Sequence, residues 1–485
     1  MDTEAFQHYL SDRCRLVAPR FDGALDDTFD GAAGGAPCGD VIRVSLEPDR
    51  GRLRARFAAE GCAAARAAAA AVAEAADDVE PLAAARIDAA TVEERLGGLT
   101  LQGRHAAELA ADALHRALAS LAGSRHGLAD PPSGRERVLV ALSGGVDSAV
   151  AALRERERGA EVVAVTLKLW ADRRTDAAKS CCSPLAVLGA RGLAHSLGVP
   201  HFTLDLEERF RAGVVEPFVA GFRAGTTPNP CVACNGELRI DAMLELARRL
   251  GCSRLVTGHY ARIADDGGGP LLRAAADPAK DQSYMLAALR PEALRRLGFP
   301  LAELTKPEVR ELAARAGLPV AGKAESQDLC FLAGEGKLAF LARHGGLAER
   351  EGEIVDGAGE VLGRHRGHHG FTVGQRRGLG VAAPEPLYVL ATDGARNRVV
   401  VGPREELARR TVRVREATLH RAGGRVDRVR LRYHAKPLGC ELGPVPAGEH
   451  ERLELELAEP AFGVAPGQTA CLLDGELVVG HATIA

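Results

Sequence analysis

From Arg137 onward, short apolar runs alternate with helical patterns, and this alternation constrains the fold more than any other feature of the sequence. The apolar runs are VLVAL (138–142), EVVAVTLKLW (161–170), HFTLDL (201–206) and RLVTGHYARI (254–263). Helical patterns lie between and after them, including ARGLAHSLG (190–198) and RIDAMLELARRLG (239–251). Strands that alternate with helices pair in parallel, because each crossover helix returns the chain to the same edge of the sheet. The sequence therefore predicts an α/β unit with a doubly wound parallel sheet.

The first of these strands leads directly into SGGVDS (Ser143–Ser148) and then into a helix. Two glycines let the backbone approach a ligand, and the amide groups of the loop and of the helix N-terminus attract phosphate. The segment is not a Walker A loop, because no Lys-Ser or Lys-Thr follows a Gly-x-x-x-x-Gly. We therefore predict a phosphate-binding loop of another kind.

A different unit precedes this sheet. Residues 1–121 combine a Gly-rich turn (31–40), a strand hairpin (VIRVSL and RLRARF) and two helices, one of them over about 104–121. This pattern indicates an α+β domain. Residues 122–136 contain Pro, Gly and Ser without periodicity, which predicts a linker.

The α/β unit extends over residues 137–348. Beyond it, short strands separated by glycines predict two small β-rich units, at 349–403 and 404–485. We therefore expect a multidomain protein with four units.

The formal net charge of −3 conceals two parts of opposite sign. Residues 1–120 hold 13 Arg and 20 Asp plus Glu, a net −7, whereas residues 121–485 hold 49 Lys plus Arg and 45 Asp plus Glu, a net +4. Ten arginines fall within 404–432, where alternation places arginines on one strand face. This face and Tyr433 predict a nucleic-acid surface. The alternatives are a solvated strand face and a genome-wide preference, since the chain carries 55 Arg and 7 Lys.

The sequence also bears on compartment. No run of about 18 apolar residues occurs, so no membrane helix is expected, and MDTEAFQHYL lacks a secretory pattern. These features predict a cytoplasmic protein without a membrane partner. The odd count of 11 cysteines argues against a disulfide framework.

Three cysteines stand in polar, turn-rich motifs. Cys231 and Cys234 lie in TPNPCVACN (227–235), and Cys330 lies in SQDLCFL (326–332). A Cys-x-x-Cys spacing is used for zinc, clusters and redox pairs, and the alternative is ordinary buried cysteine. The adjacent pair Cys181–Cys182 is either a sulfur relay or, more simply, a surface pair.

Six motifs occur in order: SGGVDS, TPNPCVACN, TGHYAR (257–262), KDQSYML (280–286), SQDLCFL and TVGQRRGLG (372–380). Together, over about residues 137–485, they resemble the tRNA-specific 2-thiouridylases of the N-type ATP pyrophosphatase superfamily. The resemblance implies an ATP-pyrophosphatase domain, a small central domain and a C-terminal β-barrel that binds tRNA. It implies that ATP, with Mg²⁺, adenylates the wobble uridine (position 34) of tRNA before sulfur enters position 2. The partners would be tRNAs with Lys-, Glu- or Gln-type anticodons, and a cysteine desulfurase or sulfur-relay protein.

The same resemblance implies residue roles. Cys234 matches the nucleophile and Cys330 the cysteine that carries a persulfide. The ATP-binding residues would be Ala141, Leu142, Ser143, Gly144, Gly145, Val146, Asp147, Ser148, Leu167 and Gly258, with Asp147 positioning the metal and pyrophosphate. The tRNA-binding residues would be Asn229, Pro230, Cys231, Lys280, Asp281, Gln282, Arg432 and Tyr433.

Cys231 departs from the family pattern, because many members have Asp at this position. Three thiolates from Cys231, Cys234 and Cys330 would suffice for a 4Fe–4S cluster with one open iron, which would bind the transferred sulfur. The alternative is a persulfide on Cys330 and a disulfide with Cys234. Both mechanisms stay open at the level of sequence.

The N-terminal unit resembles the NifU-like iron–sulfur cluster scaffolds over about residues 4–120. Cys38, Asp40 and Cys62 match the metal-binding positions of that family, and Ala106 stands where a third cysteine is expected. His105 is a replacement ligand, for a cluster or for zinc. The alternative is a degenerate module used only for docking or folding. If active, this unit would deliver a cluster or sulfur to Cys231, Cys234 and Cys330, and the fusion would raise the local donor concentration to roughly millimolar.

Two other functions compete with tRNA thiolation. One is a different ATP-pyrophosphatase ligase, such as an argininosuccinate synthase-like enzyme, which Cys234, Cys330 and the arginine-rich strands disfavour. The other is a non-catalytic iron–sulfur carrier that binds RNA, which SGGVDS disfavours because a carrier needs no adenylation site.

Overall fold

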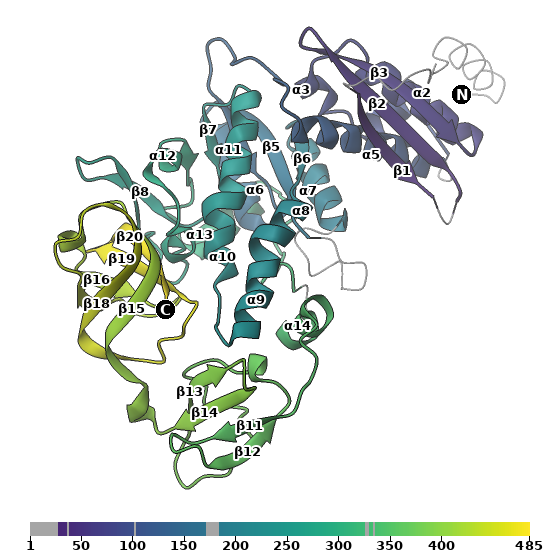
Figure 1. Cartoon of the computed structure of the whole chain (residues 1–485). Coiled ribbons are helices and arrows are strands. Elements are labelled where there is room, and N and C mark those ends of the chain that lie inside the picture. The colour runs from purple at the N-terminus through teal and green to yellow at the C-terminus, as the bar shows by residue number, and fades with distance from the viewer. Residues whose placement is uncertain (1–27, 36–37, 101–102, 171–183, 325–328, 333–334) are drawn as a thin grey trace.

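The computed structural model describes residues 28–35, 38–100, 103–170, 184–324, 329–332 and 335–485 (Figure 1). Cys14, Cys181, Cys182 and the start of SQDLCFL lie outside these residues. Four units follow one another along the chain, as the sequence predicts. In Figure 1 the N-terminal domain and the two β-rich units lie on different sides of the central α/β domain.

The central domain contains a five-stranded sheet in which every pair is parallel, in the order β10-β7-β4-β5-β6. This confirms the predicted doubly wound sheet. Strand β4 is central, and the order reverses between β4 and β7, where α/β proteins bind ligands at the carboxyl ends of the strands. The strands are β4 (Arg137–Ala141), β5 (Glu161–Lys168), β6 (His201–Asp205), β7 (Arg254–Val256) and β10 (Leu297–Gly298).

Helices surround this sheet because their apolar faces need a partner. The largest hydrophobic cluster extends continuously from the N-terminal domain into this sheet and its helices. The helices are α6 (Val146–Glu157), α7 (Pro184–Ser196), α8 (Glu207–Phe210), α9 (Glu216–Ala224), α10 (Pro230–Ala233), α11 (Ile240–Arg249), α12 (Pro291–Leu294), α13 (Lys306–Arg315) and α14 (Lys337–Gly345).

The expectation of one strand over 254–263 is wrong. Strand β7 ends at Val256, the segment 257–261 forms a loop, and β8 (Arg262–Asp265) then begins a hairpin with β9 (Pro270–Arg273). Apolar character alone does not reveal this break, because Tyr260 and Ala261 are buried in the loop as they would be in a strand.

The C-terminal unit is a closed six-stranded barrel, because β15 pairs with both β18 and β20. The hairpin β8–β9 extends the barrel sheet through pairs such as Val478 with Leu272, so the barrel is fixed to the central domain by backbone pairing. Its strands are β15 (Ala408–Leu419), β16 (Arg428–Arg430), β17 (Leu438–Glu441), β18 (Gly448–Phe462), β19 (Thr469–Asp474) and β20 (Leu477–Ile484).

The central β-rich unit is a four-stranded sheet in the order β12-β11-β14-β13. It has its own small apolar cluster around Ile354, Val389 and Val399. Its strands are β11 (Gly352–Val355), β12 (Val361–His365), β13 (Tyr388–Asp393) and β14 (Arg398–Gly402).

The N-terminal domain is α+β, as predicted, with a sheet in the order β1-β2-β3. Part of the expected Gly-rich turn is instead strand β1, because Gly31 lets this strand touch α5. A Cβ at Gly31 would lie 2.2 Å from the backbone O of Ala113 and N of Ala117. The elements are β1 (Phe29–Gly34), β2 (Val41–Asp49), β3 (Arg52–Glu60), α2 (Ala63–Ala76), α3 (Pro81–Ala84), α4 (Ala89–Arg95) and α5 (Arg104–Gly123).

Helix α5 also packs along the edge strand β6, so the N-terminal domain is docked on the central sheet (Figure 1). Arg249, at the end of α11, donates to the carbonyl oxygens of Ala122 and Ser124, and Arg191 pairs with Asp112 at 3.0 Å. Residues 128 and 129 donate backbone hydrogen bonds to the Arg249 carbonyl. The two domains therefore share an ordered contact in addition to their covalent connection.

The contact fixes the direction of α5. Its last residues lie beside Arg249, just before β7 and therefore at the edge where the parallel strands begin. Its first residues, including His105, consequently point toward the edge where the strands end.

Three histidines, His115, His195 and His201, cluster at this interface. The His115 ring lies 5.2 Å from that of His195 and 6.4 Å from that of His201. Burial lowers the pKa of all three below the usual value, and the nearby Arg191 guanidinium acts in the same direction. The histidines are therefore neutral in the folded chain near pH 7.

Among the described helices, none combines the length and the apolar character needed to span a bilayer.

We predict that acid destabilises this interface. Below pH 6.5 the histidines of the unfolded chain bind protons that those of the folded chain do not. The free energy of unfolding therefore decreases as the pH is lowered. At pH 5.5 the loss is about 1.4 kcal/mol each for His115 and His201. Denaturant unfolding of the full chain at pH 7.5 and 5.5 measures the loss, and His115→Leu should reduce it by about 1.4 kcal/mol. An unfolding free energy as high at pH 5.5 as at pH 7.5 would contradict the prediction.

Candidate active site

A cavity of about 220 Å³ opens at the carboxyl ends of β4 and β5, next to the point where the strand order reverses. It is lined by the end of β4, the start of α6, strand β5, the loop after β7 and the Cys330 segment. Residues predicted from the sequence make up much of its wall: Ala141, Leu142, Ser143, Asp147, Ser148, Leu167, Gly258, Gln282 and Cys330. The fold thus gathers residues that are up to about 190 positions apart in the sequence.

The SGGVDS loop is held open by its own hydrogen bonds. The Ser143 amide donates to Ser148 Oγ at 3.2 Å, and Ser148 Oγ donates to the Gly145 carbonyl at 3.1 Å. Gly144 has φ of +69°, which glycine adopts without strain, and Gly145 is the N-cap of α6, which begins at Val146. The loop therefore directs backbone amides and the α6 N-terminus toward one place, as phosphate binding requires.

Gly258 brings the loop after β7 against the start of α6. A Cβ at this position would lie 2.8 Å from the Asp147 carbonyl carbon and from the Ser148 nitrogen. Both are backbone atoms that cannot move without disturbing the phosphate loop. A glycine is therefore required by close approach, which explains its presence in the TGHYAR motif.

Asp147 has two partners that sequence reasoning missed. Lys306 Nζ lies 2.6 Å from Asp147 Oδ1, and the Tyr260 hydroxyl donates to the same carboxylate at 2.8 Å. A second lysine, Lys323, donates to the Gly144 carbonyl at 2.9 Å. Two ammonium groups therefore stand next to the loop. The scarcity of lysine, 7 residues against 55 arginines, is the signal that would have drawn attention to them.

His259 supplies a neutral polar group to the cavity wall. Its Nδ1 lies 2.8 Å from Thr257 Oγ1. Burial, reinforced by Arg239, lowers the pKa of His259 to about 3, so the ring is uncharged at neutral pH. Gln282 accepts a hydrogen bond from the Tyr260 amide at 3.0 Å, which ties the KDQSYML motif to the same wall.

The cysteines occupy different positions around the cavity. Cys330 is half-buried and lines it, whereas Cys234 is buried where α10 continues into a π-helical turn, Cys234–Arg239. Such turns are frequent at functional sites. Burial raises the pKa of the Cys231 thiol. The structure describes eight cysteines, and no disulfide joins any two of them.

A second cavity, of about 900 Å³, separates the TPNPCVACN segment from the barrel. Asn229, Val232 and Ala233 lie on one side, and barrel residues including Arg415 and His450 lie on the other. Glu416, also on this wall, has φ of +52°, a conformation that non-glycine residues rarely adopt.

Of the residues expected to contact tRNA, some lie in or near the TPNPCVACN segment, and others belong to the KDQSYML motif. Asn229 is the N-cap of α10 and Pro230 its first residue, while Arg432 is exposed and Tyr433 is half-buried close to Cys231. Lys280 is half-buried. Asp281 is buried, and its carboxylate accepts from Ser283 and pairs with Arg430 of the barrel at 2.9 Å, so this residue joins two domains.

Many barrel arginines face carboxylates. At least six of the ten within 404–432 pair with an acidic side chain, among them Arg413 with Glu454 and Arg425 with Asp266 and Asp474. Much of the positive charge that the sequence places on these strands is therefore compensated within the protein.

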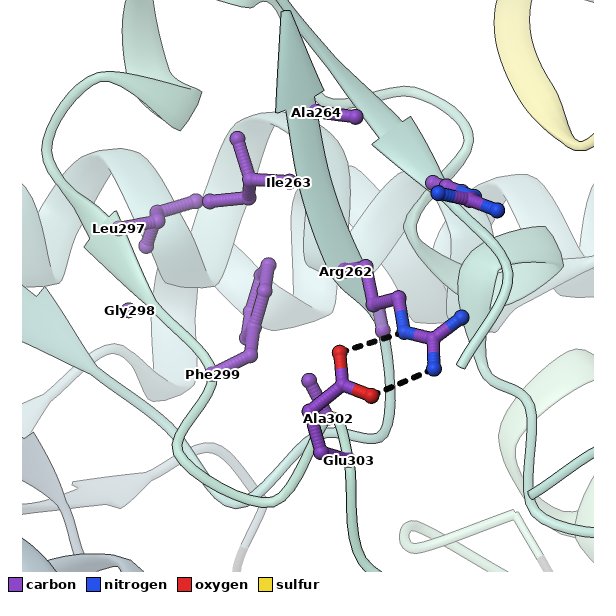
Figure 2. A pocket seen from close by; sticks show the side chains of 10 residues that line it. Arg262, Ile263, Ala264, Leu297, Gly298, Phe299, Ala302 and Glu303 are labelled. Atoms are coloured by element: carbon purple, nitrogen blue, oxygen red, sulfur yellow. Dashed lines mark hydrogen bonds and ion pairs between the residues drawn. The ribbon is translucent and has the colours of Figure 1, made fainter. Parts of the chain in front are cut away.

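A third cavity, of about 590 Å³, lies between β8 and β10 (Figure 2). Arg262 and Glu303 form a two-pronged ion pair across it, with N–O distances of 2.7 and 2.5 Å. Phe299 contributes an apolar wall. No residue of the predicted site lines it.

A separate cluster in the N-terminal domain brings together Cys38, Asp40, Cys62 and His105. The ligand atoms of Cys38, Asp40 and His105 lie within 4.8 Å of one another. Asp40 Oδ2 is 3.0 Å from His105 Nε2 and 3.3 Å from Cys62 Sγ. The Cys62 amide donates to Asp40 and holds the pKa of its carboxyl below the usual value, so Asp40 is ionised.

Ala106, where the sequence lacks the third cysteine, is fully buried in α5. The ligand atoms that lie close together are therefore one thiol, one carboxylate and one imidazole, and Cys62 is joined to this group by its hydrogen bond to Asp40.

The fold and site define a class: an adenylating enzyme of the ATP-pyrophosphatase type, joined to an α+β domain that groups Cys38, Asp40 and His105 and to a β-barrel. Comparisons with protein families agree. The chain matches the tRNA methyl transferase HUP domain over 136–334, the tRNA methyl transferase PRC-barrel domain over 339–403, the aminomethyltransferase β-barrel domain over 410–484 and the NifU-like N-terminal domain over 13–126.

One relative matches nearly the whole chain, and others match the part that follows the N-terminal domain. The bifunctional protein NifU/MnmA of Rubrobacter xylanophilus is 46% identical over 486 residues, which is 97% of each protein. The tRNA-specific 2-thiouridylase MnmA of Geobacter metallireducens is 42% identical, covering 72% of this chain and 97% of that protein. That of Acidithiobacillus ferrooxidans is 43% identical over a similar share. The chain belongs to the tRNA-specific 2-thiouridylase family, in the form that carries a NifU-like domain.

We predict that Lys306→Met weakens ATP use. Its ammonium group faces the phosphate loop, and its loss leaves the Asp147 carboxylate without its ion pair. The KM for ATP in tRNA-dependent ATP–pyrophosphate exchange should rise about tenfold, as expected for one charge-assisted contact. Arg315→Met, on the exposed far end of the same helix, is the control. An unchanged KM for ATP in Lys306→Met would contradict the assignment.

Proposed function

We propose that this protein uses ATP to replace the 2-oxygen of the wobble uridine of tRNA with sulfur. One observation carries the proposal: the SGGVDS loop and Cys330 line the same cavity, so an activated base and a sulfur-bearing cysteine would meet there. Family membership supports the same activity. Cleavage of ATP between its α and β phosphates, with adenylation of the uracil O2, makes this oxygen a leaving group.

The residues around the loop would bind ATP and stabilise the departing pyrophosphate. Ser143 to Ser148 offer amides and hydroxyls, and Lys306 and Lys323 add positive charge. Mg²⁺ is commonly held by one or two carboxylates together with phosphate oxygens, and Asp147 is a carboxylate on this wall. This donor set fits Mg²⁺, which would neutralise charge on the pyrophosphate.

Sulfur would enter by a persulfide route. The terminal sulfur of a Cys330 persulfide attacks C2 of the adenylated base, the C2–O bond breaks and AMP leaves. Cys234 thiolate then attacks Cys330 Sγ, so that a Cys234–Cys330 disulfide forms and the sulfur stays on C2. A persulfide donor, such as a cysteine desulfurase relay, reloads Cys330, and a dithiol reductant opens the disulfide.

The thiols of Cys231, Cys234 and Cys330, the three candidate ligands of a 4Fe–4S cluster, do not all line the same cavity. Cys330 lines the ATP cavity while Cys231 does not, and burial holds Cys231 in its protonated form. We therefore derive no step through a 4Fe–4S cluster, and iron and sulfide analysis of anaerobically purified protein tests this choice. Stoichiometric iron that Cys231→Ala removes together with activity would overturn it.

The substrate would enter between the central domain and the barrel. The 900 Å³ cavity is flanked by Asn229, and Tyr433 lies near Cys231, so an extruded uridine would pass polar and aromatic groups. We include Pro230, Lys280 and Arg432 in this tRNA-binding surface. Its proposed targets are tRNAs with Lys-, Glu- and Gln-type anticodons. The proposed units remain 1–121, 122–136, 137–348, 349–403 and 404–485.

We predict that Cys234→Ser and Cys330→Ser abolish thiolation but keep adenylation. Neither thiol belongs to the phosphate loop, so tRNA-dependent ATP–pyrophosphate exchange should stay within about threefold of the parent chain. Mass spectrometry of tRNA nucleosides measures 2-thiouridine. Cys252→Ala is the matched control, because burial raises the pKa of this thiol to about 12 and keeps it uncharged. Substantial 2-thiouridine formed by Cys330→Ser would contradict the persulfide role.

The N-terminal cluster would bind a metal and serve sulfur delivery. Two thiols, Asp40 and His105 suit zinc or a labile iron site, and α5 directs this cluster toward the edge of the sheet where the ATP cavity opens. Docking on β6 would keep the donor and acceptor sites within one assembly.

We predict that Cys38→Ala/Cys62→Ala lowers metal content and the 2-thiouridine level of tRNA in cells. Thiolation in vitro with a persulfide donor that loads Cys330 directly should remain, because the adenylation cavity is untouched. Cys440→Ala, in the barrel, is the control. If metal content and cellular thiolation stay unchanged, the delivery role is wrong.

A further inference from the structure

A hydrogen-bonded relay connects the N-terminal domain contact to the phosphate loop. Thr166 on β5 donates through Oγ1 to the Leu142 carbonyl at 2.6 Å, and the same Oγ1 lies 2.8 Å from His201 Nε2. Thr166 and His201 are both buried, and Thr166 also lines the ATP cavity. Leu142 is the residue directly before SGGVDS.

The geometry fixes the protons along this relay. A hydroxyl has one proton, and Thr166 gives it to the Leu142 carbonyl, so the Thr166 oxygen accepts from His201. His201 therefore carries its proton on Nε2. Its Nδ1 is buried and has no hydrogen-bond partner among the described residues, which agrees with an unprotonated nitrogen.

The relay fixes the first peptide of the phosphate loop. The Leu142 carbonyl is held by Thr166, and its amide donates to the Val165 carbonyl at 2.8 Å. The Ser143 amide belongs to the same peptide plane as the Leu142 carbonyl and donates to Ser148 Oγ. A rotation of this peptide would break both bonds and turn the loop amides away from the cavity.

The N-terminal domain covers the outer end of the relay. The His201 amide donates to the Ala85 carbonyl at 3.1 Å, and the His115 ring faces His201. His115 itself is held by the Ile87 carbonyl, while Arg191, Asp112 and His195 complete the surroundings. Because β6 is an edge strand, His201 depends on this cover for its exclusion from water.

We propose that His201 is a positioning residue for ATP, which acts through Thr166 on the Leu142–Ser143 peptide, and that the docked N-terminal domain maintains it. This role rests on the proposed function of the cavity. It assigns the NifU-like domain a second task, independent of any metal: it keeps the outer end of the relay buried, behind the Thr166 wall of the adenylation site.

Paired substitutions in the full chain test the relay. Thr166→Val keeps the shape and removes the hydroxyl, so the KM for ATP in tRNA-dependent ATP–pyrophosphate exchange should rise about three- to tenfold. Thr166→Ser restores the hydroxyl and should stay within about twofold. His201→Leu should behave like Thr166→Val, whereas His201→Gln retains a donor and should recover most of the effect. If Thr166→Val fails to fold, the comparison of His201→Leu with His201→Gln tests the relay.

A double-substitution cycle tests the contribution of the N-terminal domain. Asp112→Arg places a cation against Arg191 and weakens docking, so the KM for ATP should rise in the same direction. If docking acts through the relay, Asp112→Arg adds little to Thr166→Val. Additive effects, or an unchanged KM in both Thr166→Val and His201→Leu, would overturn the proposal.

Ser148→Ala and Lys306→Met, measured in the same assay, distinguish a failure of the relay proposal from a failure of the ATP-cavity assignment. If they raise the KM for ATP while the relay variants do not, the relay is wrong and the ATP cavity stands. If none of the variants changes the KM, the assignment of the cavity is itself wrong.

Discussion

The close approach of two backbones beside SGGVDS is the constraint on which the site depends. Gly258 lets the loop after β7 lie against Asp147 and Ser148, where any Cβ would collide with main-chain atoms. This contact joins the two halves of a doubly wound sheet at the point of reversal, and it brings Tyr260 and His259 to the cavity. From there the chain enters the β8–β9 hairpin, which pairs with the barrel. The Gly258 contact therefore lies between the cavity at SGGVDS and the β8–β9 hairpin, which pairs with the barrel proposed to bind RNA.

Several cations near the proposed substrate sites pair with carboxylates of the protein, and substrate phosphates would replace some of these carboxylates. Asp147 pairs with Lys306, and at least six arginines of the barrel pair with carboxylates. The exposed pairs among them, such as Arg413 with Glu454, cost little to break, so phosphate groups can compete for those cations. The contact between Asp281 and Arg430 is different, because both side chains are largely buried and the pair holds two domains together.

The N-terminal domain is an integral part of the assembly. Its α5 packs along β6, its carbonyl oxygens accept from Arg249, and its surface covers His201. A flexible tether would only raise local concentration, whereas a docked domain also fixes direction and excludes water. The same contact orients the Asp40 cluster toward the edge of the sheet that carries Cys330.

The sequence by itself determined the parallel sheet, the SGGVDS loop between its first strand and helix, and the cysteine motifs, and it singled out Cys38, Asp40 and His105, which the structure brings together. Each of these follows from local order: period, flanking glycines and spacing are visible along a chain. Only the tertiary structure decided where β7 ends, that part of the glycine-rich segment is strand β1, and that Lys306 and Lys323 stand at the loop. It also decided that Asp281 joins two domains and that His201 lies beneath the N-terminal domain. These features depend on contacts between residues more than 80 positions apart or on burial, and neither leaves a periodic trace in the sequence.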